Sequence, residues 1–198
     1  MANQCLIAGL GNPGADYART RHNAGFALVD RLAERWDARW TLERKFDARL
    51  ARVERAGRTC LLCQPQTYMN ESGRSVGALV DYHRLGLDQV LVAVDDADLP
   101  LGAIRMRPGG SSGGHHGLDS VASHLGSREF ARLRIGIGRA DPREREITGR
   151  VLGRFGDDEW RRFGKVIARA ADQVECWLSQ GTRTAMDQFN GIVVDATE

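Results

Sequence analysis

The sequence predicts an α/β fold: a single domain with a mixed, mostly parallel twisted sheet and helices on both faces. Three observations lead to this class. Short apolar runs alternate with longer amphipathic segments, as in sheets whose strands are joined by helices. The 198 residues contain no internal repeat, and no linker divides them. We therefore expect residues 1–198 to form one domain with a substantial core.

The first part of the chain predicts a strand, a helix and a hairpin. Residues 4–8 form an apolar run stopped by glycines, which predicts a buried strand. Residues 23–36 carry apolar side chains at helical spacing, and Asn23 is a suitable N-cap. Residues 48–54 and 58–64 are separated by a short glycine-containing turn, which predicts a hairpin.

The rest of the chain continues the alternation. Residues 72–85 predict a helix, with Gly86 as its C-terminal cap. Residues 108–117 form a glycine-rich polar loop, and residues 141–153 have no strong period, which predicts a mobile surface lid. The remaining predicted elements are strands at 89–94, 101–107 and 133–138 and helices at 118–125, 157–180 and 182–189.

The composition, 42% apolar and 27% charged, is that of an ordinary globular protein. No apolar run approaches the roughly 20 residues that span a bilayer, and the N-terminus lacks a signal-peptide pattern. We therefore expect a cytoplasmic protein with reduced cysteines and no membrane partner. Cys60 and Cys63 spell C-x-x-C within a predicted strand, where residues three apart point to opposite faces. This favours core cysteines over a metal site.

Positive charge is concentrated in one stretch of the chain. Residues 101–155 contain ten arginines and five acidic residues, a local charge of +5 against +2 for the whole chain. A local basic surface is typical of a polyanion-binding protein, and RNA is one such partner. A solvated surface in an arginine-rich chain accounts for the charge equally well.

Residues 9–14 spell G-x-G-x-x-G, the fingerprint of dinucleotide-binding folds. That fingerprint requires a helix beginning at its third glycine and an acidic residue about 20 positions on, at the end of a second strand. Here the segment "ADYARTRHN" separates the last glycine from the predicted helix, and the acidic residue, Asp30, lies inside that helix. The context argues against a nicotinamide or flavin site.

Ser75 lies in a G-x-S-x-G motif, and Asp95 and His115 follow it in the chain order of serine hydrolases. A nucleophile of that type requires a strand running directly into the serine turn. Ser75 instead falls within a helical period, and we expect it on the exposed side of that helix. A serine esterase remains a competing enzymatic hypothesis.

Several polar residues follow predicted strands. Asn12 follows the first strand, the "TYMN" segment follows the second strand of the hairpin, and Asp95 ends the most apolar strand. His22 precedes a helix, and His115 and His116 lie in the glycine-rich loop. Residues beyond the carboxyl ends of strands can converge, and a histidine, an aspartate and amide donors can make a general-base site without a protein nucleophile. Local turn and cap roles are the alternative for each residue alone.

Four segments carry a family resemblance: "GLGNPGADYARTRHNAG", "QPQTYMNESG", "DDADLPLGAIRMRPGGSSGGHHGL" and "LRIGIGR". In this order, from Leu6 to about Asn190, they resemble bacterial peptidyl-tRNA hydrolase. The resemblance implies a monomeric enzyme that uses no cofactor and no metal. It also implies hydrolysis of the ester between a peptide, or an N-blocked aminoacyl group, and the 3′ ribose of tRNA. Peptidyl-tRNA, through its acceptor stem and 3′ end, is the implied partner.

The resemblance implies two catalytic residues. The histidine of "TRHNAG" is the family's general base, so His22 takes that role here. Asp95 matches the aspartate that holds the imidazole and favours its charged form after proton uptake. Asn12 matches the residue linked to telling blocked from free aminoacyl ends.

The resemblance also implies substrate contacts. The segment Tyr68, Met69 and Asn70 matches the lining of the peptide cleft. His116 stands where the family often has Asn in "GGHNGL". An imidazole offers a donor and an acceptor in a different geometry and can become charged. The contact is then either kept and made pH-dependent or weakened, and the sequence leaves both possibilities open.

Contacts to the tRNA are implied for three further positions. Tyr17 matches a tRNA-contacting residue, and Arg107 and Arg134 match basic positions linked to tRNA phosphates. Arginine pairs bidentately with phosphate, which explains part of the basic stretch. The alternative from another class is an RNA-binding protein on this fold that lacks catalysis. The joint presence of the candidate catalytic and amide residues argues against it.

Overall fold

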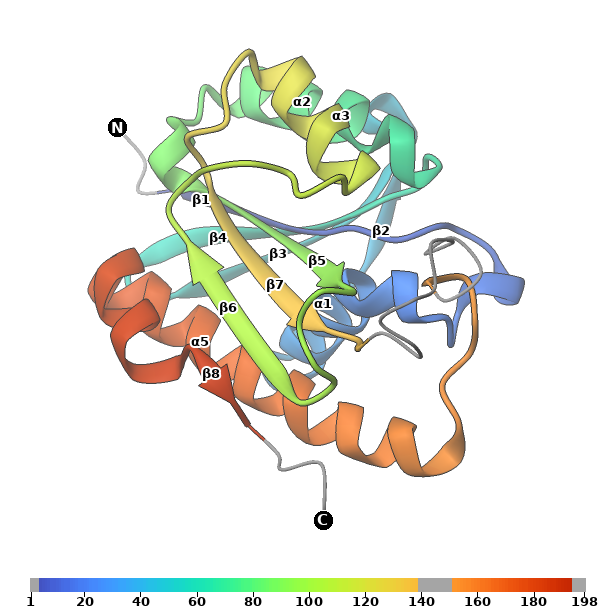
Figure 1. Cartoon of the computed structure of the whole chain (residues 1–198). Coiled ribbons are helices and arrows are strands. Elements are labelled where there is room, and N and C mark those ends of the chain that lie inside the picture. Colours follow the sequence, from blue (N-terminus) through green and yellow to red (C-terminus); the bar gives the residue numbers. More distant parts are fainter. Residues whose placement is uncertain (1–3, 139–150, 194–198) are drawn as a thin grey trace.

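The computed structural model describes residues 4–138 and 151–193, and within them one twisted eight-stranded sheet runs through the molecule (Figure 1). Its spatial order is β2-β3-β4-β1-β5-β7-β6-β8. The strands are β1 Gln4–Gly9, β2 Thr41–Glu43, β3 Ala48–Arg55, β4 Arg58–Pro65, β5 Val90–Asp96, β6 Ala103–Arg107, β7 Ala131–Gly136 and β8 Gly191–Ile192. None of the helices in the described ranges is long and apolar enough to cross a membrane.

The centre of the sheet is parallel and its edges are antiparallel. β1 lies between β4 and β5, parallel to both, and β7 extends this parallel set beside β5. The pairs β2–β3, β3–β4, β6–β7 and β6–β8 are antiparallel. The predicted mixed α/β fold is confirmed. Antiparallel pairing at the edges is more extensive than "mostly parallel" indicates, because tertiary pairing sets the direction of a strand and an apolar run does not.

Helices cover both faces of the sheet (Figure 1). They are α1 Ala24–Arg35, α2 Ser72–His83, α3 His116–Leu125 and α5 Asp157–Phe189. α1 and α5 pack on one face, and α2 and α3 pack on the other. Alternating strand side chains reach the two cores, so Cys60 lies in the first and Cys63 in the second. The two cysteines point to opposite faces, as predicted.

Predicted elements are present with small boundary shifts and one local difference. The predicted helices 157–180 and 182–189 are the two parts of α5, which are separated by the non-helical Gly181, where φ is 84°. Gly86 is not the cap of α2. Arg84 adopts the left-handed conformation (φ 53°) directly after the helix, so α2 ends before Gly86 is reached.

The burial of Ser75 differs from the prediction. Its side chain is buried, and its hydroxyl donates to the carbonyl of Asp47 at 3.1 Å. Ser75 lies one turn before the buried Leu79, and the short helix Arg44–Phe46 packs against α2, so this position is covered. The predicted lid at 141–153 lies outside the described residues except for its last three positions.

Candidate active site

Polar side chains from separate strands converge beyond the carboxyl ends of β1, β4 and β5. Asn12 follows β1, Met69 follows β4, and Asp95 lies at the end of β5. They border a cavity of about 650 Å³ that also receives His22 and the loop before α3. A hollow of about 920 Å³ lies beyond Asn12, between α1 and α5. We place the active site in the smaller cavity because the histidines and Asp95 border it.

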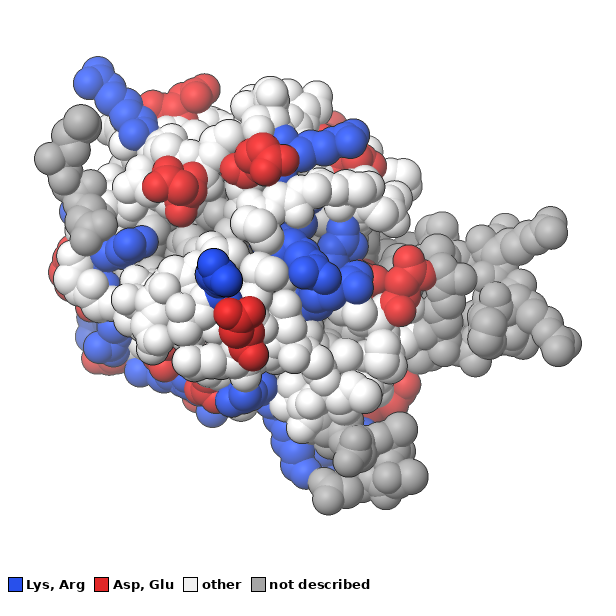
Figure 2. All heavy atoms as spheres, turned by 60° about the vertical axis from the view of Figure 1, so that its left-hand side comes forward, with Lys and Arg blue, Asp and Glu red and all other residues white. Residues whose placement is uncertain are grey.

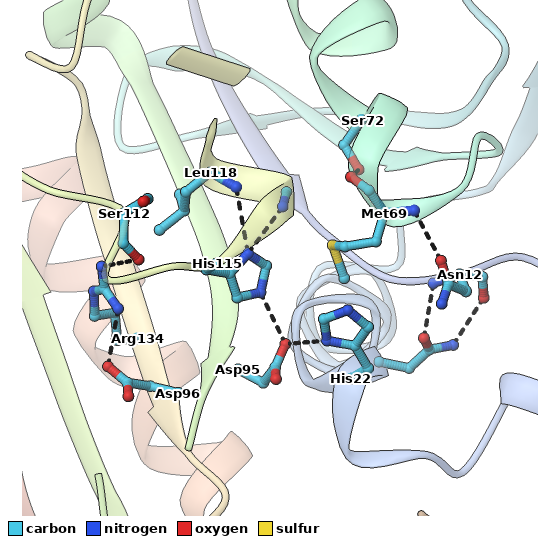
Figure 3. A network of polar contacts seen from close by, with 12 residues as sticks. Asn12, His22, Met69, Ser72, Asp95, Asp96, Ser112, His115, Leu118 and Arg134 are labelled. Carbon is cyan, nitrogen blue, oxygen red and sulfur yellow. Dashed lines mark hydrogen bonds and ion pairs between the residues drawn. The ribbon is translucent and has the colours of Figure 1, made fainter. Parts of the chain in front are cut away.

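His22 and Asp95 form a hydrogen-bonded pair in this cavity (Figure 3). Nδ1 of His22 lies 2.8 Å from Oδ1 of Asp95, whose side chain is 2% exposed. Since a carboxylate can only accept, Nδ1 carries the proton and Nε2 remains available as a base. His22 is presented by a single turn, Arg21–Asn23, that leads directly into α1.

Two histidines control the charge of Asp95. Burial by itself would raise the pKa of this carboxyl. The charge and hydrogen bond of His115, together with those of His22, outweigh burial and hold the pKa well below its usual range. Asp95 is therefore an anion wherever a histidine base can work.

His115 is the second partner of Asp95; the sequence placed it among the polar residues that can converge but did not assign it this contact. Its Nε2 lies 3.0 Å from the same Oδ1 atom. Its Nδ1 accepts from the backbone N–H groups of Gly117 and Leu118 and so caps α3. The sequence signal was its position before a helix, but histidine is not among the usual N-cap residues.

His22, Asp95 and His115 place one ligand atom each within 4.8 Å of one another, close enough to raise the question of a metal ion. The hydrogen bonds of His115 oppose this. Its Nδ1 accepts two backbone N–H groups, so the ring proton must lie on Nε2, the atom that faces the cluster. A metal would have to displace that proton and leave an imidazolate. The donor set therefore fits a hydrogen-bonded triad better than a metal site.

Asn12 is held by two neighbouring segments. Its backbone N–H donates to Oδ1 of Asn23 at 2.8 Å, and its carbonyl accepts from Nδ2 of Asn23 at 3.0 Å. Its own Oδ1 accepts from the N–H of Met69 at 2.8 Å. Asn23 stands at the N-cap position of α1, as the sequence predicts, but its side chain makes no capping hydrogen bond because the Asn12 backbone occupies it. The Asn12 amide is oriented with Nδ2 as its remaining donor.

The glycines of the opening motif allow β1 and α1 to approach closely. A Cβ on Gly9 would lie 2.1 Å from the carbonyl oxygen of Gly25, and one on Gly11 would lie 2.8 Å from the Phe26 ring. α1 begins at Ala24, well after Gly14. These contacts explain the glycine spacing by packing and by presentation of Asn12, without a bound dinucleotide.

Other candidate residues form the rim of the cavity. Tyr68 is 62% exposed, and Asn70 and His116 are exposed and also line the cavity. Met69 points inward and is buried against α3. Leu152, from the end of the predicted lid, also lines the cavity. The structure therefore brings together the predicted peptide-side residues.

The predicted tRNA-contacting residues lie in different environments. Arg107, in β6, is exposed, whereas Arg134, on the paired strand β7, is buried. Tyr17 lies in the turn Ala15–Tyr17, outside the set of residues that line the cavity. On the face shown in Figure 2, Lys and Arg side chains gather in separate groups with acidic residues between them.

The fold and the site define a class of protein: an α/β enzyme whose histidine, oriented by a buried aspartate, is suited to activating water. The sequence matches the family described as "Peptidyl-tRNA hydrolase" over residues 6–197. The chain belongs to the peptidyl-tRNA hydrolase family, which confirms the resemblance carried by its motifs.

Individual relatives agree with this assignment. A peptidyl-tRNA hydrolase of Synechococcus sp. (strain JA-2-3B'a(2-13)) is 47% identical over 93% of this chain and 82% of its own length. One of Geobacillus kaustophilus is 44% identical over 93% of this chain and 98% of its own. The crystal structure of the Acinetobacter baumannii peptidyl-tRNA hydrolase is 38% identical, with a TM-score of 0.90 over 98% of this chain and 97% of the other.

Proposed function

We propose that this protein hydrolyses the ester bond between a peptide, or an N-blocked aminoacyl group, and tRNA, with His22 as the general base. The observation that carries the proposal is the contact of His22 with the buried Asp95 at the carboxyl end of the sheet. This contact orients the imidazole so that its Nε2 atom can accept a proton beside the cavity. An ester is a much better electrophile than an amide, so activated water suffices and no cofactor or metal is required.

The reaction follows from the orientation of the imidazole. Nε2 of His22 takes a proton from water as the water oxygen bonds to the ester carbonyl carbon. Asp95 stabilises the imidazolium, and an amide donor such as Nδ2 of Asn12 or Asn70 stabilises the oxyanion. The bond to the ribose 3′ oxygen then breaks, and the imidazolium returns its proton to that oxygen. The products are tRNA with a free 3′ hydroxyl and a peptide carboxylic acid, which releases its proton to water and becomes a carboxylate at neutral pH.

The rim residues account for recognition of the two parts of the substrate. Tyr68, Met69, Asn70 and His116 surround the opening and would contact the peptide. Tyr17 and the basic residues near β6 would contact the acceptor stem of the tRNA. We infer a cytoplasmic monomer that recycles tRNA from prematurely released peptidyl-tRNA.

Two competing functions make different demands on the structure. A serine esterase needs Ser75 in a cavity beside a base, whereas Ser75 is 1% exposed and bonded to the Asp47 backbone. An RNA-binding protein without catalysis does not need a buried carboxylate that holds His22. The His22–Asp95 geometry therefore favours the hydrolase.

Hydrolysis of N-acetyl-aminoacyl-tRNA by the wild type, His22→Ala and Ser75→Ala separates these functions. We expect His22→Ala to abolish turnover while it still binds tRNA. Ser75→Ala should retain the wild-type kcat when it is assayed at a temperature at which the variant is folded. Robust turnover by His22→Ala would refute the mechanism. A wild type that binds tRNA without hydrolysis would establish the binding protein instead.

A further inference from the structure

Arg21 directly precedes the candidate base His22, and its guanidinium is buried against the chain that leads into α5. The side chain is 6% exposed. Nη1 donates to the carbonyl of Arg154 at 2.8 Å, and Nη2 donates to Oε2 of Glu159, in the first turn of α5, at 2.5 Å. The guanidinium carbon lies 5.0 Å from the centre of the Phe155 ring. Arg21 does not line the active-site cavity, so it acts on the site through these protein contacts.

The backbone around Arg21 pairs with the same part of the chain. In Figure 1 the orange chain before α5 passes beside the blue turn before α1. The N–H of Arg21 donates to the carbonyl of Gly153 at 3.0 Å, and the N–H of Phe155 donates to the carbonyl of Arg19 at 3.3 Å. These bonds flank a single antiparallel bridge. Because the backbone pairing is so short, the side-chain bonds of Arg21 add substantially to the contacts that hold it.

The paired chain is also part of the cavity wall, and we call its residues 151–155 the wall segment. The first two of these residues line the active-site cavity, and the last three pair with the chain before His22. The wall segment ends where α5 begins. There Glu159 also accepts from the N–H of Gly156 at 3.0 Å, so the carboxylate that binds Arg21 is itself held at the helix terminus. A displacement of the wall segment would therefore disturb both the cavity and the turn that carries His22.

Stability alone is a weak explanation for this arginine. Taking a charged pair out of water costs free energy that the attraction between the charges often fails to offset. Arginine instead offers direction, because its rigid, planar group can bond a carboxylate and a carbonyl together. Here one acceptor lies in α5 and the other in the wall segment. The contacts of Arg21 therefore fix the turn that carries His22, the wall segment and α5 relative to one another.

We propose that Arg21 is a positioning residue: it locks the wall segment to the turn that carries His22, so that the general base and the cavity wall keep their relative positions. His22 is then supported from two sides, by Asp95 at its Nδ1 atom and by the bonds of Arg21 at its backbone. The part of the inference that concerns turnover rests on the proposed hydrolase function. The part that concerns the positions of His22 and the wall segment does not.

The kinetic test compares Arg21→Lys with Arg31→Gln. Arg31 is the matched control because it forms an exposed ion pair with Glu34 on α1, the helix that follows the same turn. A lysine keeps the charge but cannot bond Glu159 and the Arg154 carbonyl in the same geometry, so Arg21→Lys should lower kcat about tenfold to a hundredfold. Affinity for deacylated tRNA should stay near the wild-type value, and Arg31→Gln should change neither quantity.

Two results of this comparison would overturn the proposal. One is a wild-type kcat in a folded Arg21→Lys variant, which would leave Arg21 with a role in stability alone. The other is a retained kcat with weaker tRNA binding and a salt slope reduced by about 1, which would assign Arg21 to a phosphate contact.

Glu159→Gln tests the other end of the ion pair. The new amide can still accept from the N–H of Gly156, so the start of α5 is kept while the charge is lost. If Arg21 acts by holding α5 and the wall segment, this substitution should lower kcat, by a smaller factor than Arg21→Lys does. The loss in the double variant should be less than the product of the two single losses. A wild-type kcat in Glu159→Gln, or losses that multiply in full, would contradict the positioning role.

Two NMR measurements do not depend on turnover. The Phe155 amide donates across the pairing, and in Arg21→Lys its hydrogen exchange should accelerate by about tenfold or more. Nitrogen-15 spectra should show His22 with its proton on Nδ1 in the wild type, and that signal should shift or broaden in Arg21→Lys but not in Arg31→Gln. An unchanged His22 signal, or unchanged exchange at Phe155, would refute the positioning role even if the wild type lacked hydrolase activity. If both signals respond but the wild type shows no turnover, only the proposed function is refuted.

Discussion

Replacing Asp95 with Asn removes the negative charge that both active-site imidazoles contact, at 2.8 and 3.0 Å. During the reaction His22 acquires a positive charge beside this group. Two unit charges about 4 Å apart interact by about 4 kcal/mol at an effective dielectric constant of about 20. A neutral hydrogen bond to the amide recovers about 1 kcal/mol. The net loss of about 3 kcal/mol corresponds to roughly a hundredfold decrease in kcat.

Orientation of the new amide adds to this loss. When the NH₂ group of the introduced amide faces His22, Nδ1 of His22 must accept a hydrogen bond, and the ring proton moves to Nε2. An imidazole in that tautomer cannot take a proton from water. We therefore expect kcat to fall by about 10²- to 10³-fold in total.

The assay is release of N-acetylamino acid from saturating N-acetyl-aminoacyl-tRNA, with tRNA binding measured separately. Asp98→Asn is the matched control, because it removes the same charge from an exposed position three residues away. It should change kcat by less than about threefold. If Asp95→Asn also stays within about threefold of the wild type, the electrostatic role of Asp95 is wrong.

Three further predictions concern packing, recognition and pH. Gly25→Ala places a Cβ 2.3 Å from the Ala93 carbonyl oxygen and should destabilise the fold by about 1–3 kcal/mol in urea unfolding. Gly164→Ala, which adds its Cβ in open space, should not destabilise it, and equal losses would contradict the packing argument. His116→Asn replaces an imidazole at the cavity with an amide whose donor and acceptor lie in a different geometry, so KM for N-acetyl-aminoacyl-tRNA should change while kcat is retained; an unchanged KM would exclude a contact between His116 and the substrate. The histidines hold the pKa of Asp95 below its usual range, so its stabilising contribution is present above the unfolded pKa of about 3.9 and is lost as pH falls toward the lower folded value. The difference in Tm between the wild type and Asp95→Asn should therefore shrink from pH 5 to pH 2, and a constant difference would show that charge is not its source.

The local sequence pattern was sufficient to predict much of the fold. The apolar runs at 4–8 and 89–94 predicted β1 and β5, because a buried parallel strand needs a continuous apolar segment. The C-x-x-C spacing correctly predicted that Cys60 and Cys63 lie on opposite faces of the sheet, because side chains alternate along a strand. The convergence of Asn12 and Asp95 followed from their positions at the ends of parallel strands.

Residues whose roles depend on a distant partner were harder to predict. The sequence placed His115 in a loop near the site but could not assign its bond to Asp95, since that bond joins residues 20 positions apart through the approach of α3 to β5. Ser75 is buried because the chain near Asp47 returns over α2. The basic stretch predicted phosphate contacts, and charge alone could not separate the buried Arg134 from the exposed Arg107.

The sequence by itself determined the α/β class, the candidate base His22 and the family, because these depend on local periodicity and on contiguous motifs. Only the tertiary structure decided that His22 and His115 share one carboxylate oxygen and that Gly9 and Gly11 serve close packing. It also decided that Arg134 faces Asp96 and two loop carbonyls. The physical reason is that hydrogen bonds and ion pairs act over about 3 Å. Only folding brings residues far apart in the chain within that distance.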